Sequence, residues 1–479
     1  MSQTATPKSE VARTVLVTGA TGYIGGQLVP ALLARGWTVR VLSRSASRLQ
    51  THAWAVGVDV VEGDASDPAA LDRALAGVDV AYYLLHSMDG GGDFVRRDRE
   101  LARAFSDAAG RAGLPRLVYL SGLHPEGPLS DHLGSRVEVG EVFLDGPTPA
   151  IVLQTGIVIG AGSASFDMLR HLTERLPVMV APIWLKNRIQ PIAVDDLVHY
   201  LVALAELPGV VNRTFDLGGP EVFTYADLIE RYARLVGLGH RWIRTVPVLT
   251  PGLASLWVGL VTPVRAGIAR PLVGSLVHDA VAREHDLLGL VDEPAGGRAS
   301  FTDAVRAATR TLDPLRWRRT VATIGAATAA CAVVGGILTT PGSRWYRGLR
   351  RPGFQPPAAA FPVVWTTLFA AIAVAASATI AELEEAGRRT EADRFRNAYL
   401  ANLAMNTAWS AVFFRSHALG PASLLAAALA ASAADLARRA EPLGKGRAAA
   451  FGAYSAWCTF ATLLTSAVAH LNPSGGRRA

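Results

Sequence analysis

Five apolar segments in the carboxyl-terminal third constrain the fold of this chain more than any other feature. They lie near residues 320–340, 358–381, 397–414, 418–437 and 447–470. Each approaches or exceeds the roughly 20 residues that a helix needs to cross the hydrocarbon core of a bilayer. Because a backbone in lipid must satisfy its own hydrogen bonds, we expect these segments to be membrane-spanning helices that pack into an all-α bundle.

The sequence changes character at about residue 315. Mean hydropathy of the whole chain is +0.26, but before this point apolar and charged segments alternate. A chain of 479 residues has room for two or three domains. We therefore predict a first domain over 12–312, whose substrate-binding part covers about 161–312, a linker over 313–319 and a membrane domain over 320–472.

Charge and cysteine content exclude several classes of function. The net charge is +7, but the arginines are scattered and no nucleic-acid motif accompanies them, so we expect no nucleic-acid partner. Basic clusters instead flank apolar segments, which favours contact with a lipid bilayer. Cys331 and Cys458 both lie in apolar segments, so neither a disulfide nor a metal site is expected. The first dozen residues lack the apolar core of a signal peptide, which predicts a cytoplasmic first domain on a bacterial inner or plasma membrane.

The first domain alternates short apolar runs with helical patterns. Strands are predicted near 15–17, 39–42, 58–61, 78–85, 117–120 and 151–153, with a helix over 25–35. This alternation is typical of a doubly wound α/β domain with a parallel sheet, of the Rossmann type. Thr224 to Asp227 predicts a capping box at a helix start. The charge-free stretch from Val246 to Val264 is interrupted by three prolines, so we expect a buried or membrane-surface element there instead of a span.

A glycine-rich turn follows the first predicted strand. It reads Thr18-Gly19-Ala20-Thr21-Gly22-Tyr23-Ile24-Gly25 and opens the first helix. Gly19 permits the tight turn, Gly22 lets a pyrophosphate approach the backbone and Gly25 lets the helix pack on the strand. The amides at the start of the helix then face the phosphates. A dinucleotide is therefore the predicted ligand, with Gly19, Thr21, Gly22, Tyr23, Ile24 and Gly25 around it.

The second strand decides between the two nicotinamide cofactors. An NAD site usually has an acidic residue at the end of this strand, but here the sequence is Arg40-Val41-Leu42-Ser43-Arg44. Arg44 suits a 2′-phosphate, so NADP(H) is favoured over NAD, although Arg40 could be a solvated surface charge. Asp64, followed by Ala65, comes after the third strand and could accept a hydrogen bond from the adenine amino group.

Residues 13–312 resemble the extended or atypical short-chain dehydrogenase/reductases. Besides the glycine turn, the matching phrases are Tyr119-Leu120-Ser121-Gly122, Gln190-Pro191-Ile192-x-x-Asp195-Asp196 and Leu217-Gly218-Gly219-Pro220. The family normally uses Ser, Tyr and a Lys four residues after the Tyr. The chain has only Lys8, Lys186 and Lys445, and none follows a Tyr at this spacing.

Aligning the family's catalytic region with residues 132–141 implies His132 at the Tyr position and Arg136 at the Lys position, with Ser121 retained. A histidine of ordinary pKa, near 6.5, suits proton transfer. The alternative is that His132 and Arg136 are structural and that the nucleotide is bound without turnover.

Aromatic and amide side chains share helix faces in the membrane domain. Asn402, Asn406, Trp409 and Phe413 follow helical spacing, and the same holds for Phe361 with Trp365 and for Tyr454 with Trp457. Asn at bilayer depth is costly toward lipid, so these faces should turn into the bundle. We predict a pocket there for a flat apolar ligand, the alternative being simple helix packing.

Residues 320–472 resemble the TspO/MBR family of tryptophan-rich sensory proteins. The resemblance rests on Trp345-Tyr346-x-x-Leu349-x-x-Pro352-x-Phe354-x-Pro356-Pro357, Phe361-x-x-Val364-Trp365, Asn402-x-x-x-Asn406-x-x-Trp409 and Tyr454-x-x-Trp457. It implies a five-helix membrane domain that binds porphyrins, other tetrapyrroles or isoprenoids such as sterols, with Trp345 among the pocket residues. A homodimer through this domain is a further expectation.

Two functions follow from these resemblances. The first is a membrane-tethered, NADP(H)-binding oxidoreductase of the reductase type, coupled to a domain that binds a hydrophobic small molecule. The second is a sensor or carrier without enzymatic activity, in which the nucleotide only reports redox state. His132 in place of Tyr is the feature that separates them.

Overall fold

The computed structural model describes residues 13–86, 94–125, 127, 129–246, 262 and 272–473. It divides into two compact units, Met1–Leu312 and Asp313–Ala479. The predicted element over 246–264 lies almost entirely outside the described residues, as does residue 12.

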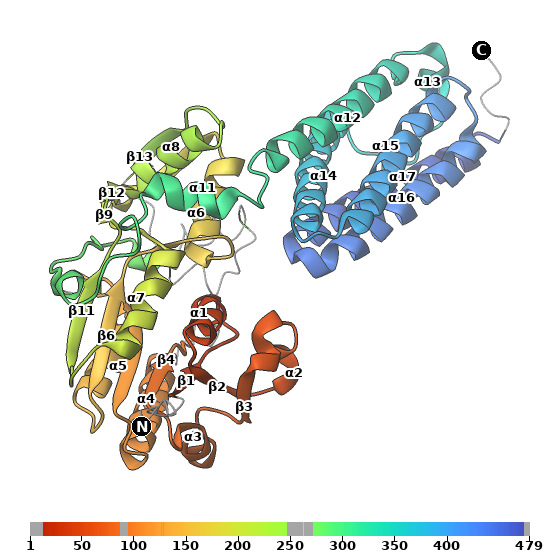
Figure 1. Ribbon diagram of the computed structural model, residues 1–479. Helices are drawn as coiled ribbons and strands as arrows, with labels where there is room; N and C mark the ends of the chain where they lie inside the picture. The colour runs from red at the N-terminus through yellow and green to blue at the C-terminus, as the bar shows by residue number, and fades with distance from the viewer. Residues whose placement is uncertain are drawn as a thin grey trace, which may run out of the picture. The chain divides into compact units, whose positions relative to one another are not determined.

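The first unit is built on a parallel sheet of seven strands in the order β11-β6-β5-β4-β1-β2-β3 (Figure 1). Parallel pairing of Val15 with both Val39 and Val80 places β1 between β2 and β4. The sheet contains all six predicted strands and one that was not foreseen, β11. Its strands are β1 (Thr14–Thr18), β2 (Thr38–Ser43), β3 (Val58–Glu62), β4 (Val80–Tyr83), β5 (Arg116–Gly122), β6 (Ala150–Thr155) and β11 (Arg213–Leu217).

Helices cover both faces of this sheet, as the near-continuous apolar strands require. One face packs on α1 (Tyr23–Ala34) and α7 (Val194–Glu206) around a core that includes Leu28 and Leu201. The other face packs on α3 (Pro68–Leu75), α4 (Phe94–Arg111) and α5 (Asp131–Leu144) around Phe105 and Phe143. In open α/β sheets the ligand crevice lies at the carboxyl ends of the strands where the strand order switches direction, which in this sheet is between β1 and β4.

The rest of the first unit is less regular. It comprises the helices α2 (Ala46–Leu49), α6 (Ala164–Arg175), α8 (Tyr225–Leu235) and α11 (Phe301–Thr309), the short turns η1 (Ala53–Gly57), η2 (Ile183–Lys186) and η3 (Asp286–Gly289), and three two-stranded sheets. These sheets pair β7 (Val158–Ile159) with β10 (Ile192–Ala193), β9 (Arg188–Ile189) with β12 (Phe223–Thr224), and β8 (Val178–Pro182) with β13 (Trp242–Val246). The predicted capping box is confirmed, because Thr224 and Asp227 bond each other's backbone amides at the start of α8.

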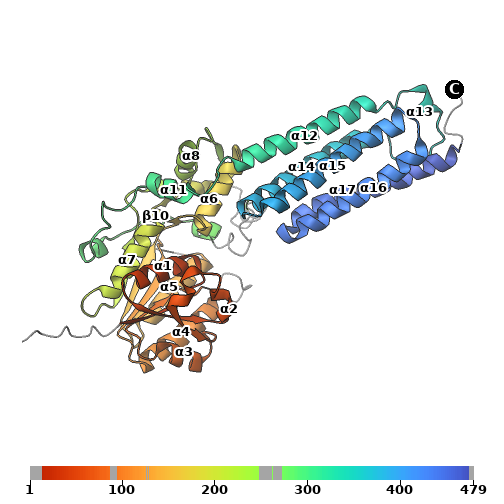
Figure 2. The ribbon, with the colours of Figure 1, turned by 45° about the vertical axis from the view of Figure 1, so that its right-hand side comes forward.

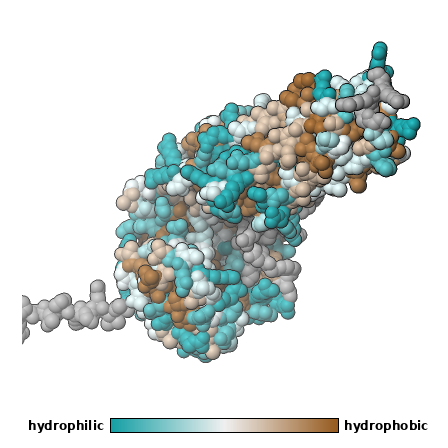
Figure 3. Space-filling model, turned by 90° about the vertical axis from the view of Figure 1, so that its right-hand side faces the viewer, coloured by the Kyte–Doolittle hydropathy of each residue, from teal (hydrophilic) through white to brown (hydrophobic). Residues whose placement is uncertain are grey.

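The second unit is a bundle of long helices (Figure 2). They are α12 (Arg316–Leu338), α14 (Ala360–Glu385), α15 (Arg389–Phe414), α16 (Leu419–Ala440) and α17 (Lys445–Leu471), with short α13 (Arg344–Gly348) and η4 (Glu441–Leu443) between them. By length and composition α12, α14 and the helix from Leu419 to Leu443 could span a membrane. The mean hydropathy of α15 and α17 is lower than that of these three helices. In α15, Asn402 and Asn406 contribute to the lower value. Apolar side chains gather on the outer surface of this unit (Figure 3).

Acidic residues at the end of α14 tie this helix to three neighbours. Glu385 pairs with Arg316 of α12, Glu384 with Arg396 of α15 and Glu382 with Arg447 of α17. Arg316 is the first residue of α12, so residues 316–319 of the predicted linker are helical. At this helix start Arg316 pairs with Glu385 and Arg319 with Asp313.

Candidate functional site

The glycine turn has the close contacts that its sequence requires. Gly19 has a φ of +73°, and a side chain there would place its Cβ 2.7 Å from the carbonyl oxygen of Leu84. At Gly25 a Cβ would lie 2.4 Å from the carbonyl oxygen of Gly19. The Gly22 amide donates to that same oxygen at 2.9 Å. The turn therefore admits only glycine at two of these positions, and it holds the start of α1 at the crevice between β1 and β4.

The amino terminus of α1 is suited to an anion. Its first turn contains no acidic residue, and no side chain caps it, since Gly22 is the cap. Thr21 and Gly22 are exposed, whereas Tyr23 and Ile24 are half-buried. Unpaired amides and the helix dipole attract a phosphate at such an end. The residues present thus fit a dinucleotide pyrophosphate.

The two arginines of β2 have different surroundings. Arg40 donates hydrogen bonds to the carbonyl oxygens of Ala74 and Ala76, which makes it structural. Arg44 is exposed at the end of the strand. The pKa of Asp64 is lowered, mainly by hydrogen bonds from the amide and hydroxyl of Ser66 and in smaller part by Arg44. Arg44 and Asp64 therefore lie near each other beyond the carboxyl ends of β2 and β3, and Ala65 packs against the core.

A connected series of three polar side chains, two buried and one half-buried, lies beyond the carboxyl end of β4. The carboxylate of Asp98, on α4, lies 3.0 Å from Nδ1 of His86, and Nε2 of His86 lies 3.1 Å from Nδ1 of His132 on α5. Ser135 donates to the same oxygen of Asp98 at 3.4 Å. Asp98 is 5% exposed and His132 is 8% exposed. The sequence therefore predicted one member of a connected series of three.

Both histidines of this series favour the neutral form. Burial, the Arg136 guanidinium and His86 lower the pKa of His132 to about 2, with Asp98 opposing them. Burial, followed by Arg136, also lowers the pKa of His86. The expectation of an ordinary histidine pKa near 6.5 at position 132 is wrong, because removing the imidazolium from water costs more than Asp98 returns.

Unpaired polar atoms gather at the carboxyl ends of β5 and β6. The hydroxyls of Ser121 and Thr155, Oε1 of Gln154 and Nε of Arg136 are buried without a hydrogen-bond partner among the residues that the structure describes. Ser121 and Gln154 face each other in register across the two strands. Arg136 is held by a bond from Nη1 to the carbonyl oxygen of Leu120, at 3.1 Å. Buried polar atoms without a partner call for a physical explanation, such as a bound ligand or an ordered water molecule.

Several polar residues of this region were not predicted, Thr155 among them. The others include His86 and Asp98, together with Gln154 and His124, whose side chains lie 3.0 Å apart. A signal for Gln154 and Thr155 was present, because both are polar residues that follow the apolar run Ile151–Leu153. For Asp98 the sequence pattern was weaker: it is a single acidic residue on the face of α4 that is otherwise formed by apolar and small side chains.

In the helical unit the predicted pocket residues form two groups. The first joins α14 to α17: Trp365 lies 6.2 Å from Tyr454 and 6.4 Å from Trp457, and Phe361 lies 6.0 Å from Trp457, between ring centroids. Asn406 of α15 donates to the Tyr454 hydroxyl at 3.1 Å. Nε1 of Trp457 is buried without a partner in the described part of the chain, so it could donate to a ligand.

The second group lies near the carboxyl end of α15. Trp409 stacks on Phe413 at 5.3 Å, and Trp345 of α13 contacts Phe413 at 5.6 Å and stacks on His417 at 4.0 Å. These residues pack into a different apolar cluster from Trp365. Asn402 instead donates to Ser432 of α16. The nine residues predicted to line a pocket thus lie in separate groups, because a shared helix face does not fix positions along the helix axis. Their role as pocket residues stays a prediction.

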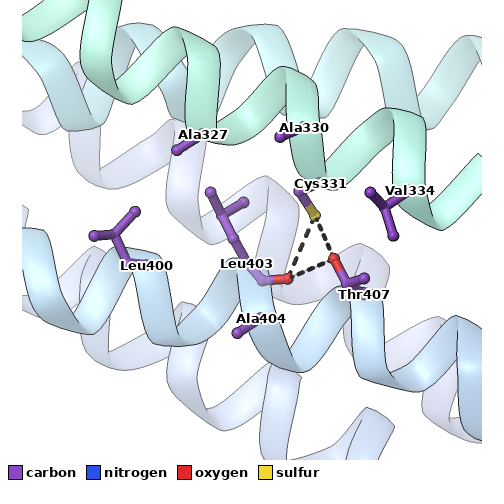
Figure 4. Close-up of a pocket in the computed structure, with 8 residues that line it drawn as sticks. All are labelled: Ala327, Ala330, Cys331, Val334, Leu400, Leu403, Ala404 and Thr407. Carbon is purple, nitrogen blue, oxygen red and sulfur yellow. Dashed lines mark hydrogen bonds between the residues drawn. The ribbon is translucent and has the colours of Figure 1, made fainter.

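A shallow groove of about 280 Å³ runs between α12 and α15 (Figure 4). It is lined by Ala327, Ala330, Cys331, Val334, Leu400, Leu403, Ala404 and Thr407. The Thr407 hydroxyl donates to the Cys331 sulfur and the Leu403 carbonyl, both at 3.2 Å. The polar atoms in this groove thus bond one another, which leaves an apolar surface.

Comparison with known proteins follows the division into units. Residues 19–141 match the NAD(P)H-binding family, and residues 323–471 match the TspO/MBR family. Over 269 residues the chain is 30% identical to a ceramide reductase of Caulobacter vibrioides, an alignment that covers 53% of this chain and 82% of that protein. Over 145 residues it is 30% identical to protein CrtK of Rhodobacter capsulatus, covering 30% of this chain and 88% of that protein. The chain is an atypical short-chain dehydrogenase/reductase domain fused to a TspO/MBR domain.

A third relative is named a reductase, like the first. A divinyl chlorophyllide a 8-vinyl-reductase of Zea mays is 29% identical over 282 residues, which cover 53% of this chain and 69% of that protein. The glycine turn of the short-chain dehydrogenase/reductase domain opens the region that matches the NAD(P)H-binding family, and Asp98 and His132 fall within it. All five long helices contribute to the region that matches the TspO/MBR family, so the chain is an integral membrane protein.

Proposed function

We propose that the short-chain dehydrogenase/reductase domain reduces an apolar substrate with NAD(P)H at the carboxyl edge of its sheet. The observation that carries this proposal is the series Asp98, His86 and His132, on which the guanidinium of Arg136 acts. In the described part of the chain, Nε of Arg136 and the hydroxyls of Ser121 and Thr155 have no hydrogen-bond partner. Titratable groups with strongly shifted pKa values beside unsatisfied polar atoms are typical of active sites. The names of the ceramide and chlorophyllide relatives support a reductase with an apolar substrate.

NADP(H) is the proposed cofactor, and when bound it supplies the hydride. Gly19, Gly22 and Gly25 would hold its pyrophosphate against the start of α1. Arg44 would pair with the 2′-phosphate, because β2 ends without an acidic residue and Arg44 is exposed there. Asp64 retains an oxygen besides the one that Ser66 engages, and this oxygen would accept from the adenine amino group.

His132 is the proposed proton-transfer group. Asp98 as a carboxylate accepts from Nδ1–H of His86, so Nε2 of His86 accepts from Nδ1–H of His132. This order leaves the lone pair on Nε2 of His132, which would take a proton from a bound water molecule and pass it to the substrate atom that becomes basic on hydride addition. The hydroxide left behind would take a proton from bulk solvent. The Ser121 hydroxyl and Nε of Arg136 would donate hydrogen bonds that orient the same substrate atom.

The TspO/MBR domain is proposed to bind a flat apolar ligand of the tetrapyrrole or isoprenoid class. Phe361, Trp365, Tyr454 and Trp457 offer aromatic faces, and Trp457 offers an unpaired indole N–H. We infer that all five long helices cross the bilayer, because α15 and α17 have 26 and 27 residues. The first domain would then be cytoplasmic, where NADP(H) is found, and a homodimer through the helices remains a proposal.

Two observations favour a second function, that of a redox or ligand sensor or carrier. No Tyr precedes a Lys by four residues in this chain, and a histidine of pKa about 2 carries few protons at neutral pH. Under this alternative NADP(H) would bind without being consumed.

The two functions are separated by NADPH oxidation in the full-length protein, reconstituted in lipid nanodiscs and offered ceramide-like and tetrapyrrole compounds. His132→Phe should lower turnover by roughly 10²-fold or more while leaving NADPH affinity intact. The matched control is His240→Phe, which removes an exposed histidine from the same domain. Unaltered turnover in the His132 variant would exclude His132 as the proton donor. Failure of every compound to elicit oxidation would favour the sensor.

A further inference from the structure

The sheet of β8 and β13 presents an apolar face to its surroundings. Along β8 the side chains alternate, with Met179 and Ala181 buried and Val178 and Val180 exposed by 64% and 59%. A two-sided ribbon in water normally places polar residues at its outward positions. Here two valines occupy them, so this face is not adapted to water.

The partner strand extends the same face. Trp242 pairs with Val178 and Arg244 with Val180 in the parallel register, and Trp242 is 68% exposed. Ile183, in the turn η2 that follows β8, is 53% exposed, and Lys186 ends that turn. We call Val178, Val180, Ile183, Lys186, Trp242 and Arg244 the ribbon patch. Other exposed valines of this unit, such as Val56 and Val210, belong to separate elements.

The composition of the ribbon patch fits a lipid–water interface. Aliphatic side chains can enter the acyl region, a Trp ring prefers the headgroup level, and Arg and Lys pair with anionic lipids. Neither strand nor the turn η2 contains an acidic residue. A protein partner would be expected to meet a more mixed surface, with polar groups that set its orientation.

The chain itself keeps this unit at a membrane. α12, the first helix that could span a bilayer, begins at Arg316, directly after the first unit ends at Leu312. So short a connection cannot carry the unit far from the bilayer surface. In the sequence, no charged residue follows β13 until Arg265.

We propose that the ribbon patch docks on the bilayer surface and seats Val178, Val180 and Trp242 among the lipids. Docking would place the reductase domain where a membrane-dissolved molecule can reach it. The proposal concerns the surface alone and does not depend on whether the domain is an enzyme.

The test uses full-length protein in nanodiscs that contain anionic lipid. Cys331 and Cys458 are replaced by Ala, and a polarity-sensitive fluorophore is attached to Val180→Cys. Lipids with a nitroxide on the acyl chain should quench this label several-fold more than a label at Val56→Cys, whose side chain is 99% exposed. Aqueous iodide should quench the two labels in the opposite order. A label at Val178→Cys should repeat the result at Val180.

Two results would overturn the proposal. Strong iodide quenching at Val180 would mean that the patch faces water. Protection of Val180 from both quenchers would mean that protein covers it, either another part of this chain or a second copy. The labelled positions are exposed, so the labels themselves do not disturb a core, and all labels share the same cysteine-free background.

Discussion

At the scale of single residues, Arg40 and Arg44 illustrate how position decides role. Arg40 is committed to the backbone of residues 74 and 76, whereas Arg44 is exposed at the end of β2. Arg44→Gln should therefore weaken NADPH binding by about 2–3 kcal/mol, the value of charge-assisted bonds to a phosphate, and leave NADH binding unchanged. Calorimetric titration with both nucleotides measures this difference. Arg35→Gln, at an exposed arginine that pairs with Glu206, is the control. Equal losses for both nucleotides would remove the role of Arg44 in cofactor choice.

A second prediction at this scale concerns His132 and the pH dependence of the free energy of unfolding. The pKa of His132 is about 2 in the folded protein, below the ordinary value, so the unfolded chain binds more protons as the pH falls. The contribution of His132 is fully present above the unfolded pKa near 6.5 and is lost progressively below it, by about 1.4 kcal/mol per pH unit. Pulse proteolysis of the first unit in urea, between pH of about 7.5 and 5, should record this loss. In His132→Gln the decline should be shallower. An identical decline in both proteins would mean that His132 is protonated when folded.

At the scale of elements, the sequence predicts the regular strands and helices. It does not predict which side chains from different elements come into contact. Six strands of the sheet follow from short apolar runs between helical patterns, because burial on both faces requires such runs. β11 was missed, since Arg213 and Asp216 interrupt its apolar pattern. The glycine turn could be predicted because its geometry is local. The contact of His86 with Asp98 and His132 could not, because it depends on how α4 and α5 pack against β4, which no local pattern encodes.

A prediction at the same scale concerns ligand affinity in the TspO/MBR domain. Trp365 and Trp457 belong to the group that joins α14 and α17, whereas Trp409 packs with Phe413 elsewhere. If a porphyrin stacks in the first group, Trp365→Ala should weaken its binding by about 1–3 kcal/mol, and Trp409→Ala should have little effect. Quenching of tryptophan fluorescence during titration measures both affinities, and Trp37→Ala in the other unit controls for loss of a fluorophore. Similar losses from Trp365→Ala and Trp409→Ala would indicate general destabilisation of the bundle.

At the scale of the whole molecule, each unit has its own hydrophobic core. The clusters around Leu28 and Phe105 use residues of the first unit only, and those around Tyr399 and Phe413 use residues of the second only. A domain with its own core can fold alone. Residues 1–312, produced separately, should therefore bind NADPH with the affinity of the full chain, as measured by calorimetry. If the ribbon patch docks on lipid, part of this fragment should also float with anionic vesicles, and Val180→Ser with Trp242→Ser should release it without changing NADPH affinity. A fragment that binds no nucleotide would mean that the first unit requires the helices in order to fold.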